Sequence, residues 1–425
     1  MKIHFVGIGG IGLSGIARLL KSYGHTISGS DIKETTLTKQ LQSEGMKITI
    51  PHDEKNITNQ DLVIYTAVTK KDNPELQKAK QLGIKTLSRR EALNLIVNDK
   101  KVYSVCGAHG KSTTSAILAS ILKDSNALIG AESKDFKSNC RVSDSNILVF
   151  EADESDGSFV DSNPYCAIVT NAEPEHMEFY NYDYELFYKH YEDFINKADK
   201  KVLCSDDEFL NSQQADKVSI KDIKNINYQL VDNLPKTTFE FLGESFEVYG
   251  FGEHIALDAS LAIKATLNEL SLYEIKENIK NYKGIKKRFD ILQNYDNFVV
   301  IDDYGHHPTE IKATLQSAFK FAELKNIDKV IAIWQPHKYS RTIDNLKSFI
   351  ECFEGVDELI ILPVWSAGEE KRDIDFKTLF KRYNPIFANN IITKDKEIII
   401  NDKTYNKGLV IGFGAGDITY QLRDS

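Results

Sequence analysis

Two glycine-rich turns constrain the fold of this chain more than any other feature of its sequence. Each follows a short apolar segment and precedes a helical one: Val6 leads into "GIGGIG", and Cys106 leads into "GAHGKSTT". A strand, a glycine turn and a helix start together form a cradle for phosphate, because the first amides of a helix have no partner within it. Two such turns predict at least two α/β units, each built on a mostly parallel sheet.

Strand and helix patterns alternate along the chain and divide it into three units. With 425 residues the chain exceeds what one hydrophobic core supports, so several domains are expected. The segments that we predict as strands are residues 2–6, 25–31 and 61–68, then 101–107, 146–153 and 165–173, then 298–304, 329–335, 358–364 and 408–414. A polar hairpin is expected over residues 225–249. We therefore predict an α/β protein with domains at residues 1–99, 100–285 and 286–425.

Composition excludes several classes of protein. The chain is 41% hydrophobic and 27% charged, which is ordinary for a soluble globular protein. Its net charge of -9 argues against a general nucleic-acid binder, which would carry a basic surface. The five cysteines are scattered without a Cys-x-x-Cys pair, so neither a disulfide framework nor a zinc site is indicated. We see no signal peptide and no apolar run long enough to span a membrane, and we predict a cytoplasmic protein without membrane insertion.

The first glycine turn has several possible ligands. Gly7, Gly9 and Gly12 satisfy the G-x-G-x-x-G pattern, and Asp31 ends the next strand, where dinucleotide enzymes place a ribose-binding acid. The turn alone is compatible with NAD, with another diphosphate such as a nucleotide sugar, or with tight strand–helix packing.

The second turn predicts a nucleotide site with a metal. It lacks the first glycine of the Walker pattern, whose place Val105 takes, but Lys111 follows Gly110 at a helix start and is itself followed by hydroxyl side chains. Acidic residues follow the next strand, where carboxylates can meet a metal ion held at the phosphate loop. These residues are Glu151, Asp153, Glu154 and Asp156. His176 follows a further strand of the same predicted sheet, with Glu173 and Glu175 nearby.

Taken together, five segments resemble the Mur ligase family of peptidoglycan synthesis. They are "GIGGIGLSGIA", "GAHGKSTT", "EADESDGSF", "IDDYGHHPTEI" and "WQPHKYSRT", and they occur in the order of the family. The resemblance implies three domains: an N-terminal Rossmann-like domain for a UDP-sugar, a central P-loop-type ATPase domain, and a C-terminal Rossmann-like domain that closes over ATP and an amino acid. In this family the shorter glycine loop is normal, so Val105 is no defect.

The resemblance also implies an activity. The match is strongest to the branch that joins L-alanine to the lactyl carboxylate of UDP-N-acetylmuramic acid through an acyl phosphate, releasing ADP and phosphate. ATP and two Mg²⁺ ions are expected as cofactors. UDP-N-acetylmuramate and L-alanine are the expected partners, and a monomer or weak dimer is the expected state.

Site residues carry over from the family motifs to matching positions. The expected catalytic residues are Lys111, His176, Arg288 and His307. The expected ATP-binding residues are Gly107, Ala108, His109, Gly110, Lys111, Ser112, Thr113, His254, Asp258, Arg288 and Asp303. UDP-sugar contacts are expected from Gly9, Gly10, Gly12, Ser14, Asp31, His52 and Arg89, with Arg90 as an alternative to Arg89. The amino-acid side is expected to be formed by Tyr304, His306, His337 and Arg341. Ser112 or Thr113 with Glu151 is expected to hold one Mg²⁺, and Glu151 with His176 a second.

One departure and three alternatives remain at this point. The family segment that meets adenine usually reads His-Asn-x-x-Asn, whereas here His254 is followed by Ile255 and Asp258. A muropeptide ligase that attaches a recycled tripeptide to the same UDP-sugar shares both turns. A non-catalytic UDP-sugar sensor would not need the metal-binding acids, and a dehydrogenase would need neither those acids nor the second turn. The C-terminal "GFGAGD" lacks a lysine and predicts a close-packed turn rather than a third cradle.

Overall fold

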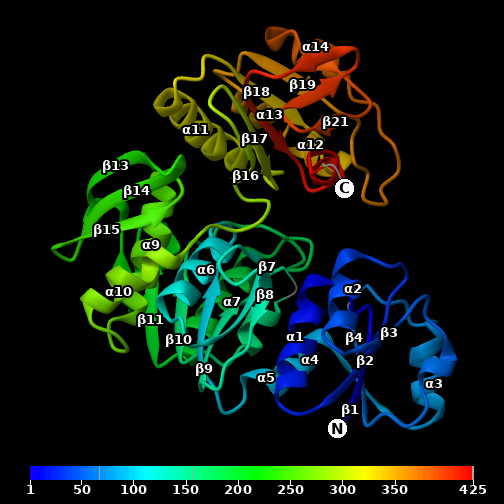
Figure 1. Cartoon of the computed structure of the whole chain (residues 1–425). Coiled ribbons are helices and arrows are strands. Elements are labelled where there is room, and N and C mark those ends of the chain that lie inside the picture. Colours follow the sequence, from blue (N-terminus) through cyan, green and yellow to red (C-terminus); the bar gives the residue numbers. More distant parts are fainter. Residues whose placement is uncertain (67, 156, 424–425) are drawn as a thin grey trace. The chain divides into compact units, whose positions relative to one another are not determined.

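The structure is a computed structural model that describes residues 1–66, 68–155 and 157–423 (Figure 1). Ala67, near the end of one predicted strand, and Asp156, in the acidic segment, lie outside the described residues. Contacts within the chain define two compact units: Met1–Ile223 with Leu257–Tyr282, and Lys224–Ala256 with Lys283–Ser425. Among the described residues, no helix combines the length and apolar character needed to cross a membrane.

The first unit begins with a sheet of five parallel strands in the order β3-β2-β1-β4-β5. The strands are β1 (Lys2–Val6), β2 (Thr26–Ser30), β3 (Lys47–Thr49), β4 (Leu62–Tyr65) and β5 (Lys85–Ser88). The helices are α1 (Ile11–Ser22), α2 (Thr36–Ser43), η1 (Glu54–Asn56), α3 (Pro74–Gln81), α4 (Arg89–Ala92) and α5 (Asn94–Val97). Helices α1 and α3 flank the sheet (Figure 1). The first glycine turn joins central strand β1 to α1, so it lies at the carboxyl edge of the sheet, where α/β proteins bind ligands.

The second sheet of this unit has seven strands in the order β12-β11-β10-β6-β9-β7-β8, and only β8 is antiparallel to its neighbour. The strands are β6 (Lys101–Cys106), β7 (Asn126–Ser133), β8 (Ser138–Arg141), β9 (Ile147–Glu151), β10 (Cys166–Val169), β11 (Lys200–Cys204) and β12 (Asp216–Val218). The helical elements are α6 (Lys111–Ile121), η2 (Ser158–Asp161), α7 (Tyr184–Lys197), α8 (Glu208–Ser212), η3 (Ile220–Asp222), α9 (Glu253–Thr266), α10 (Leu272–Asn278) and η4 (Ile279–Asn281). Residues Thr114–Ile121 of α6 are all buried, so this helix is enclosed by the rest of the unit.

The two sheets of the first unit are joined through α1. Asn139 of β8 donates from Nδ2 to the carbonyl oxygen of Ile11 at 2.6 Å, and Arg18 donates from Nη1 to Asn139 Oδ1 at 2.7 Å. Gly15 lets the helix approach β7 closely, because a Cβ there would lie 2.0 Å from Leu128 Cδ1. The helix that starts at the first glycine turn is therefore packed directly on the sheet that carries the second.

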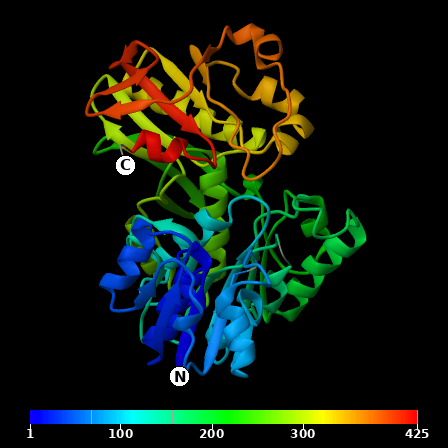
Figure 2. The same cartoon turned by 90° about the vertical axis from the view of Figure 1, so that its right-hand side faces the viewer.

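The second unit contains a sheet of six strands in the order β16-β17-β24-β18-β19-β20, parallel except for β16. Figure 2 shows the C-terminal part of this unit in yellow to red. Its strands are β16 (Asp290–Asn294), β17 (Phe298–Asp303), β18 (Val330–Trp334), β19 (Glu358–Ile361), β20 (Ile386–Phe387) and β24 (Gly408–Phe413). The helical elements are α11 (Pro308–Lys325), α12 (Tyr339–Asp344), α13 (Leu346–Cys352), α14 (Phe376–Leu379), η5 (Lys381–Tyr383) and α15 (Ile418–Leu422). Two antiparallel sheets accompany it: β13 (Lys224–Val231) with β14 (Leu234–Phe241) and β15 (Glu244–Tyr249), and β21 (Ile392–Lys394) with β22 (Glu397–Ile400) and β23 (Lys403–Tyr405).

The predicted polar hairpin, residues 225–249, forms strands β13, β14 and β15. By its contacts this segment groups with the second unit. Tyr228 and Leu230 of β13 pack against the core of the C-terminal sheet, and Ser317 of α11 donates to the carbonyl oxygen of Phe251 at 2.9 Å. These contacts account for the grouping of the hairpin with the second unit.

The C-terminal "GFGAGD" turn is close-packed. A Cβ at Gly416 would lie 2.3 Å from Gln335 Oε1 and 2.7 Å from Trp365 Cγ. Gln335 also donates from Nε2 to Asp417 at 2.5 Å. The turn is thus filled by the protein's own side chains, in agreement with the interpretation from sequence.

The close approach of α1 to β7 leads to a first prediction. Gly15→Ala should lower the free energy of unfolding by up to about 2 kcal/mol, because overpacking against Leu128, which costs about 1–3 kcal/mol, outweighs the gain of about 1 kcal/mol in helix propensity. Gly15→Ala combined with Leu128→Ala should be less destabilising than the sum of the two single changes. Urea unfolding of the three variants measures this coupling, and strict additivity would contradict the packing argument.

Candidate active site

The second glycine turn, between β6 and α6, is shaped by two glycines in the left-handed region. Gly107 has φ 138° and Gly110 has φ 82°. A Cβ at Gly107 would lie 2.1 Å from Thr170 Oγ1, and one at Gly110 would lie 2.7 Å from Asp258 Oδ1. Among the described residues, no side chain caps the start of α6. The amides of the first helical turn are therefore available to bind an anion, as in phosphate-binding loops.

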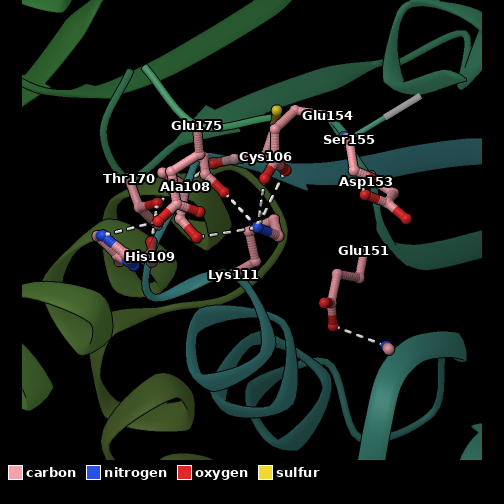
Figure 3. Close-up of polar contacts among 12 residues, drawn as sticks. Cys106, Ala108, His109, Lys111, Glu151, Asp153, Glu154, Ser155, Thr170 and Glu175 are labelled. Atoms are coloured by element: carbon pink, nitrogen blue, oxygen red, sulfur yellow. Dashed lines mark hydrogen bonds and ion pairs between the residues drawn. The ribbon is translucent and has the colours of Figure 1, made fainter. Parts of the chain in front are cut away.

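Lys111 lies folded over this turn and is paired with a buried carboxylate. Its Nζ donates to the carbonyl oxygens of Gly107 at 2.5 Å and Ala108 at 3.1 Å, and lies 2.9–3.0 Å from the two oxygens of Glu154 (Figure 3). Burial alone would lower the pKa of Lys111, but Glu154 and Glu151 outweigh it and raise that pKa. Burial raises the pKa of Glu154 to about 7, against the opposing effect of Lys111.

The acidic residues after β9 point in three directions. Glu151 accepts from Ser112 Oγ at 2.9 Å and from the amide of Gly130 at 2.7 Å. Figure 3 draws it apart from the pair formed by Lys111 and Glu154. Burial raises the pKa of Glu151 as well. Asp153 lies 3.4 Å from Arg89, while Glu154 points to Lys111. The three carboxylates of this segment thus have three different partners: the Ser112 hydroxyl, Arg89 and Lys111.

A group of potential metal ligands lies beside the phosphate loop. Ligand atoms of Glu154, Glu175 and His176 all lie within 4.8 Å of one another. Two carboxylates and an imidazole can hold a divalent cation. The sequence predicts that Glu151 and His176 share a metal ion. In the structure Glu151 accepts a hydrogen bond from Ser112, and the carboxylates grouped with His176 are those of Glu154 and Glu175. Their order along the chain could have suggested this, since Glu154 follows β9 and Glu175 and His176 follow β10, and these two strands lie on either side of β6.

The other expected residues of this loop have structural partners. The backbone amide of His109 donates to Asn171 Oδ1 at 3.2 Å, and its Nε2 lies 3.4 Å from Glu173 and 3.6 Å from Glu175. Ser112 and Thr113 occupy the first turn of α6.

The first glycine turn is held by the residues that end β2. The amide of Gly9 donates to Asp31 Oδ2 at 2.7 Å. Gly10 precedes α1, and no side chain in the described part of the chain caps that helix. Ser14 departs from expectation: it is fully buried and donates to the carbonyl oxygen of Ile11 at 2.8 Å, so its hydroxyl serves its own helix.

Arg89 lies between the two turns of the first unit. A Cβ at Gly12 would lie 2.8 Å from Arg89 Nη1, and Arg89 Nη2 lies 3.4 Å from Asp153 Oδ2. The neighbouring Arg90 reaches Asp161 instead, at 2.5 Å. Of the two arginines that the sequence left open, Arg89 is the one that reaches the glycine turn.

In the second unit, the expected residues gather at the carboxyl ends of β17 and β18. The rings of Tyr304 and His306 have centroids 5.3 Å apart, and those of His306 and His337 are 5.8 Å apart. Arg341 Nη1 lies 3.0 Å from His337 Nδ1. Burial lowers the pKa of His337 to about 4, and the charge of Arg341 adds to this effect, so the ring is neutral at pH 7.

Asp303 and Glu310 fix the turn that carries the paired histidines. Asp303 accepts from the amides of Phe289 at 2.7 Å and Gly305 at 2.8 Å. Burial raises its pKa to about 6, while Arg288 opposes this rise. Glu310, which sequence reasoning missed, lies 3.2 Å from Arg288 Nη1 and accepts from the amide of His306 at 3.1 Å. The amide of His307 also donates to Glu310, at 3.3 Å.

Family models match almost the whole chain. The model described as Mur ligase family, catalytic domain, matches residues 2–101. The Mur ligase middle domain matches residues 105–266, and the model described as Mur ligase, glutamate ligase domain, matches residues 287–411. The chain belongs to the Mur ligase family.

Within the family, the chain is highly similar in sequence to proteins that share one name. The chain is 55% identical to UDP-N-acetylmuramate–L-alanine ligase of Helicobacter pylori (strain P12), with 99% of this chain and 96% of that protein covered. It is 51% identical to the protein of the same name from Campylobacter curvus (strain 525.92), with 99% of both chains covered. Among solved structures, UDP-N-acetylmuramate-alanine ligase MurC from Thermotoga maritima superposes with a TM-score of 0.82 at 27% identity, covering 100% of this chain and 98% of that chain.

A murein peptide ligase from Psychrobacter arcticus shares the fold only. Its TM-score is 0.66 at 19% identity, covering 100% of this chain and 99% of that chain. The predicted three-domain α/β architecture of a Mur ligase is thus confirmed, and the alanine-adding proteins are similar to this chain at much higher identity.

In this Mur ligase, Asp258 lies against the phosphate loop. Its carboxylate occupies the space that a Cβ on Gly110 would need. Burial raises the pKa of Asp258 to about 8, and a hydrogen bond from Thr114 only partly opposes this. At pH 7 a neutral acid thus takes the place of the amide that is usual in the family. His254, one helical turn earlier, is also neutral, since burial lowers its pKa to about 4.

The raised pKa of Asp258 leads to a prediction about stability. Between about pH 4 and pH 8 the folded protein keeps this proton while the unfolded chain loses it, so stability falls as pH rises through this window. The side chain in Asp258→Asn is neutral at every pH, so this variant should not lose stability across the window. Its free energy of unfolding should therefore rise relative to that of the unchanged protein by up to about 1.4 kcal/mol per pH unit. Urea unfolding of both proteins at about pH 5 and about pH 8 tests this. Parallel pH profiles would show that Asp258 is ionised when folded.

Proposed function

We propose that this chain is an ATP-dependent ligase that joins L-alanine to the lactyl carboxylate of UDP-N-acetylmuramic acid, yielding UDP-N-acetylmuramoyl-L-alanine, ADP and phosphate. One observation carries the proposal: two uncapped glycine turns, one with Lys111 and metal-ligand carboxylates, lie in the same compact unit with Arg89 between them. A ligase that phosphorylates a nucleotide-linked acid needs two such anion sites. Relatives that are 51–55% identical over 99% of this chain carry the name of this activity.

The chemistry proceeds in two balanced steps. A lactyl carboxylate oxygen attacks the γ-phosphorus of ATP, and ADP leaves with the bond electrons. The amino nitrogen of L-alanine then attacks the acyl carbon, phosphate leaves, and the amine loses a proton. In the first step two anions approach each other, and two unit charges 4 Å apart repel by about 4 kcal/mol at an effective dielectric near 20. Positive groups must offset this repulsion.

Lys111 and the start of α6 supply part of that positive charge. The Nζ of Lys111 and the amides of the first helical turn are donors for the β- and γ-phosphates. Arg89, close to the first glycine turn and to Asp153, is suited to orient the lactyl carboxylate of the sugar. These groups are largely held in place by the fold, so little reorganisation is needed during reaction.

Two sets of residues fit Mg²⁺. Glu154, Glu175 and His176 would hold one ion, and Ser112 with Glu151 would hold another, since hydroxyl and carboxylate oxygens are the ligands this ion prefers. When bound, Mg²⁺ would neutralise phosphate charge and polarise the transferred group.

The second unit would supply the amino-acid side and the base site. Arg341 is suited to pair with the carboxylate of L-alanine, and Arg288, held by Glu310, to contact phosphate. A cavity of about 450 Å³ in this unit is lined by His254, Tyr228, Phe251, Gln316 and Lys320, among others. Its aromatic and amide groups suit a purine base. We also place the reaction in the cytoplasm, where the five buried free cysteines would stay reduced.

The acceptor decides between this activity and attachment of a recycled tripeptide. We expect phosphate release from Mg-ATP and UDP-N-acetylmuramate to require L-alanine and to yield the UDP-sugar monopeptide. Release that requires L-Ala-D-Glu-diaminopimelate would instead assign a muropeptide ligase. Tight UDP-sugar binding without release by any acceptor would assign a sensor.

Lys111 should be essential for turnover. Lys111→Met should lower kcat/KM by about 100- to 1,000-fold, the loss typical of removing one donor to a developing charge. Lys189→Met is a matched control on α7, because Lys189 is exposed and pairs only loosely, at 3.4 Å, with Asp193. Binding of UDP-N-acetylmuramate to both variants, measured by calorimetry, verifies that the fold is kept. Near-normal turnover in Lys111→Met would exclude the assigned role.

A further inference from the structure

A fully buried carboxylate in the N-terminal sheet has no role in the chemistry above. Glu75 lies in the first turn of α3, and its side chain is 0% exposed. An ionised carboxylate taken out of water costs several kcal/mol unless it is fully paired. Such a group is retained only where its neighbours compensate it, so its partners indicate what it is for.

Both oxygens of Glu75 accept several hydrogen bonds. Oε1 accepts from Asn56 Nδ2 at 2.6 Å and from the amide of Asp53 at 3.3 Å. Oε2 accepts from the hydroxyl of Ser30 and lies 3.3 Å from His52 Nδ1. These partners come from the end of β2 and from the segment between β3 and β4.

The same carboxylate has a further histidine behind it. His4 Nε2 of β1 lies 3.5 Å from Glu75 Oε2, and His4 Nδ1 pairs with Ser28 Oγ at 2.9 Å. Burial raises the pKa of Glu75, but hydrogen bonds from His4, Asn56 and Ser30 outweigh it and bring that pKa to about 2. The group is therefore ionised throughout the physiological range.

Ser30 connects this network to the first glycine turn. Its carbonyl oxygen accepts from the amides of Gly7 at 2.9 Å and Ile8 at 3.0 Å. Its hydroxyl is held by Glu75 and lies 2.8 Å from His52 Nδ1. Glu75 thus holds Ser30, and Ser30 holds the first glycine turn. Glu75 Oε2 also lies beside the ring of His52, whose side chain is 17% exposed.

We propose that Glu75 is a positioning residue of the UDP-sugar site, which fixes His52 and, through Ser30, the backbone of the first glycine turn. This inference rests on the proposed function, because it assumes that the first turn binds the UDP-sugar. Glu75 itself does not touch the ligand. It acts by holding His52 and Ser30 in the positions that the UDP-sugar site requires.

A carboxylate accepts from all of these donors at once. Both groups around Oε1 donate, and Ser30 donates to Oε2. A glutamine has nearly the same shape, but it carries no charge, and its amide nitrogen would require the Ser30 hydroxyl to turn from donor to acceptor. Glu75→Gln therefore disturbs the network without leaving a cavity.

The test measures UDP-N-acetylmuramate binding by calorimetry, without ATP, and steady-state kinetics in parallel. Glu75→Gln should raise the Kd for UDP-N-acetylmuramate by about tenfold, the effect of losing one hydrogen bond to a charged group. The KM for ATP and the kcat at saturating UDP-sugar should stay within about twofold, because the hydrogen-bond donors to Glu75 belong to the first sheet and its loops, whereas the ATP loop belongs to the second sheet. A general loss of folded protein would instead lower the binding stoichiometry and the apparent kcat together.

Ser28→Ala is the matched control. It removes the hydroxyl on the far side of His4 and touches neither Ser30 nor His52, so its Kd should match that of the unchanged protein. If Glu75→Gln does not fold, Ser30→Ala decides, since it cuts the link between Glu75 and the turn while leaving the other donors to Glu75. We expect it to raise the same Kd.

The outcomes separate the two proposals. An unchanged Kd in a folded Glu75→Gln, or in Ser30→Ala where Glu75→Gln does not fold, overturns the positioning role. An equal rise in Ser28→Ala also overturns it, because the effect would then be general to the sheet. Failure of the unchanged protein to bind UDP-N-acetylmuramate would instead refute the proposed function.

Discussion

Lys111 is a positive charge largely withdrawn from water, and the geometry of the central phosphate loop depends on how that charge is compensated. Two carbonyl oxygens of the loop and the carboxylate of Glu154 surround its ammonium group. Glu154 in turn has a raised pKa, so the pair is held near the limit at which a buried carboxylate stays ionised. The positions of the acidic segment after β9 follow from this pairing, since Glu154 must point inward while Glu151 and Asp153 turn to other partners.

The first unit brings two anion sites together by packing rather than by sequence proximity. Helix α1 starts at one glycine turn and lies on β7 and β8 of the other sheet, where Gly15 and Asn139 make the contact close. Arg89 lies beside Gly12 of the first turn and also reaches Asp153, in the acidic segment that follows β9 of the second sheet. Because interiors pack as densely as crystals, a change at this contact shifts one site relative to the other. The spacing of the two sites is thus a property of the core.

The sequence predicted what depends on local pattern. Strands β9 and β24 are nearly continuous apolar runs, as is typical of strands buried on both faces, β1 and β6 are largely apolar, and both glycine turns follow from residue type. It missed the β7–β8 hairpin, whose polar residues gave no strand pattern. It also missed the network of Glu75, whose partners Ser30 and Asn56 lie 45 and 19 residues away along the chain. The roles expected of Ser14 and of Glu151 beside His176 differ from the contacts observed, since side-chain direction is set by tertiary neighbours.

Both phosphate cradles are engaged by the protein's own carboxylates. Asp31 accepts from the amide of Gly9 in the first turn, and Glu154 pairs with Lys111 in the second. A bound phosphate would compete with each carboxylate for the same donor, which lowers net affinity but keeps the donors oriented before the ligand arrives. A phosphate that takes Lys111 also frees an oxygen of Glu154, and that oxygen already lies within the group formed with Glu175 and His176. Phosphate binding and cation binding at this loop are therefore expected to favour each other, because the same carboxylate is exchanged between the two.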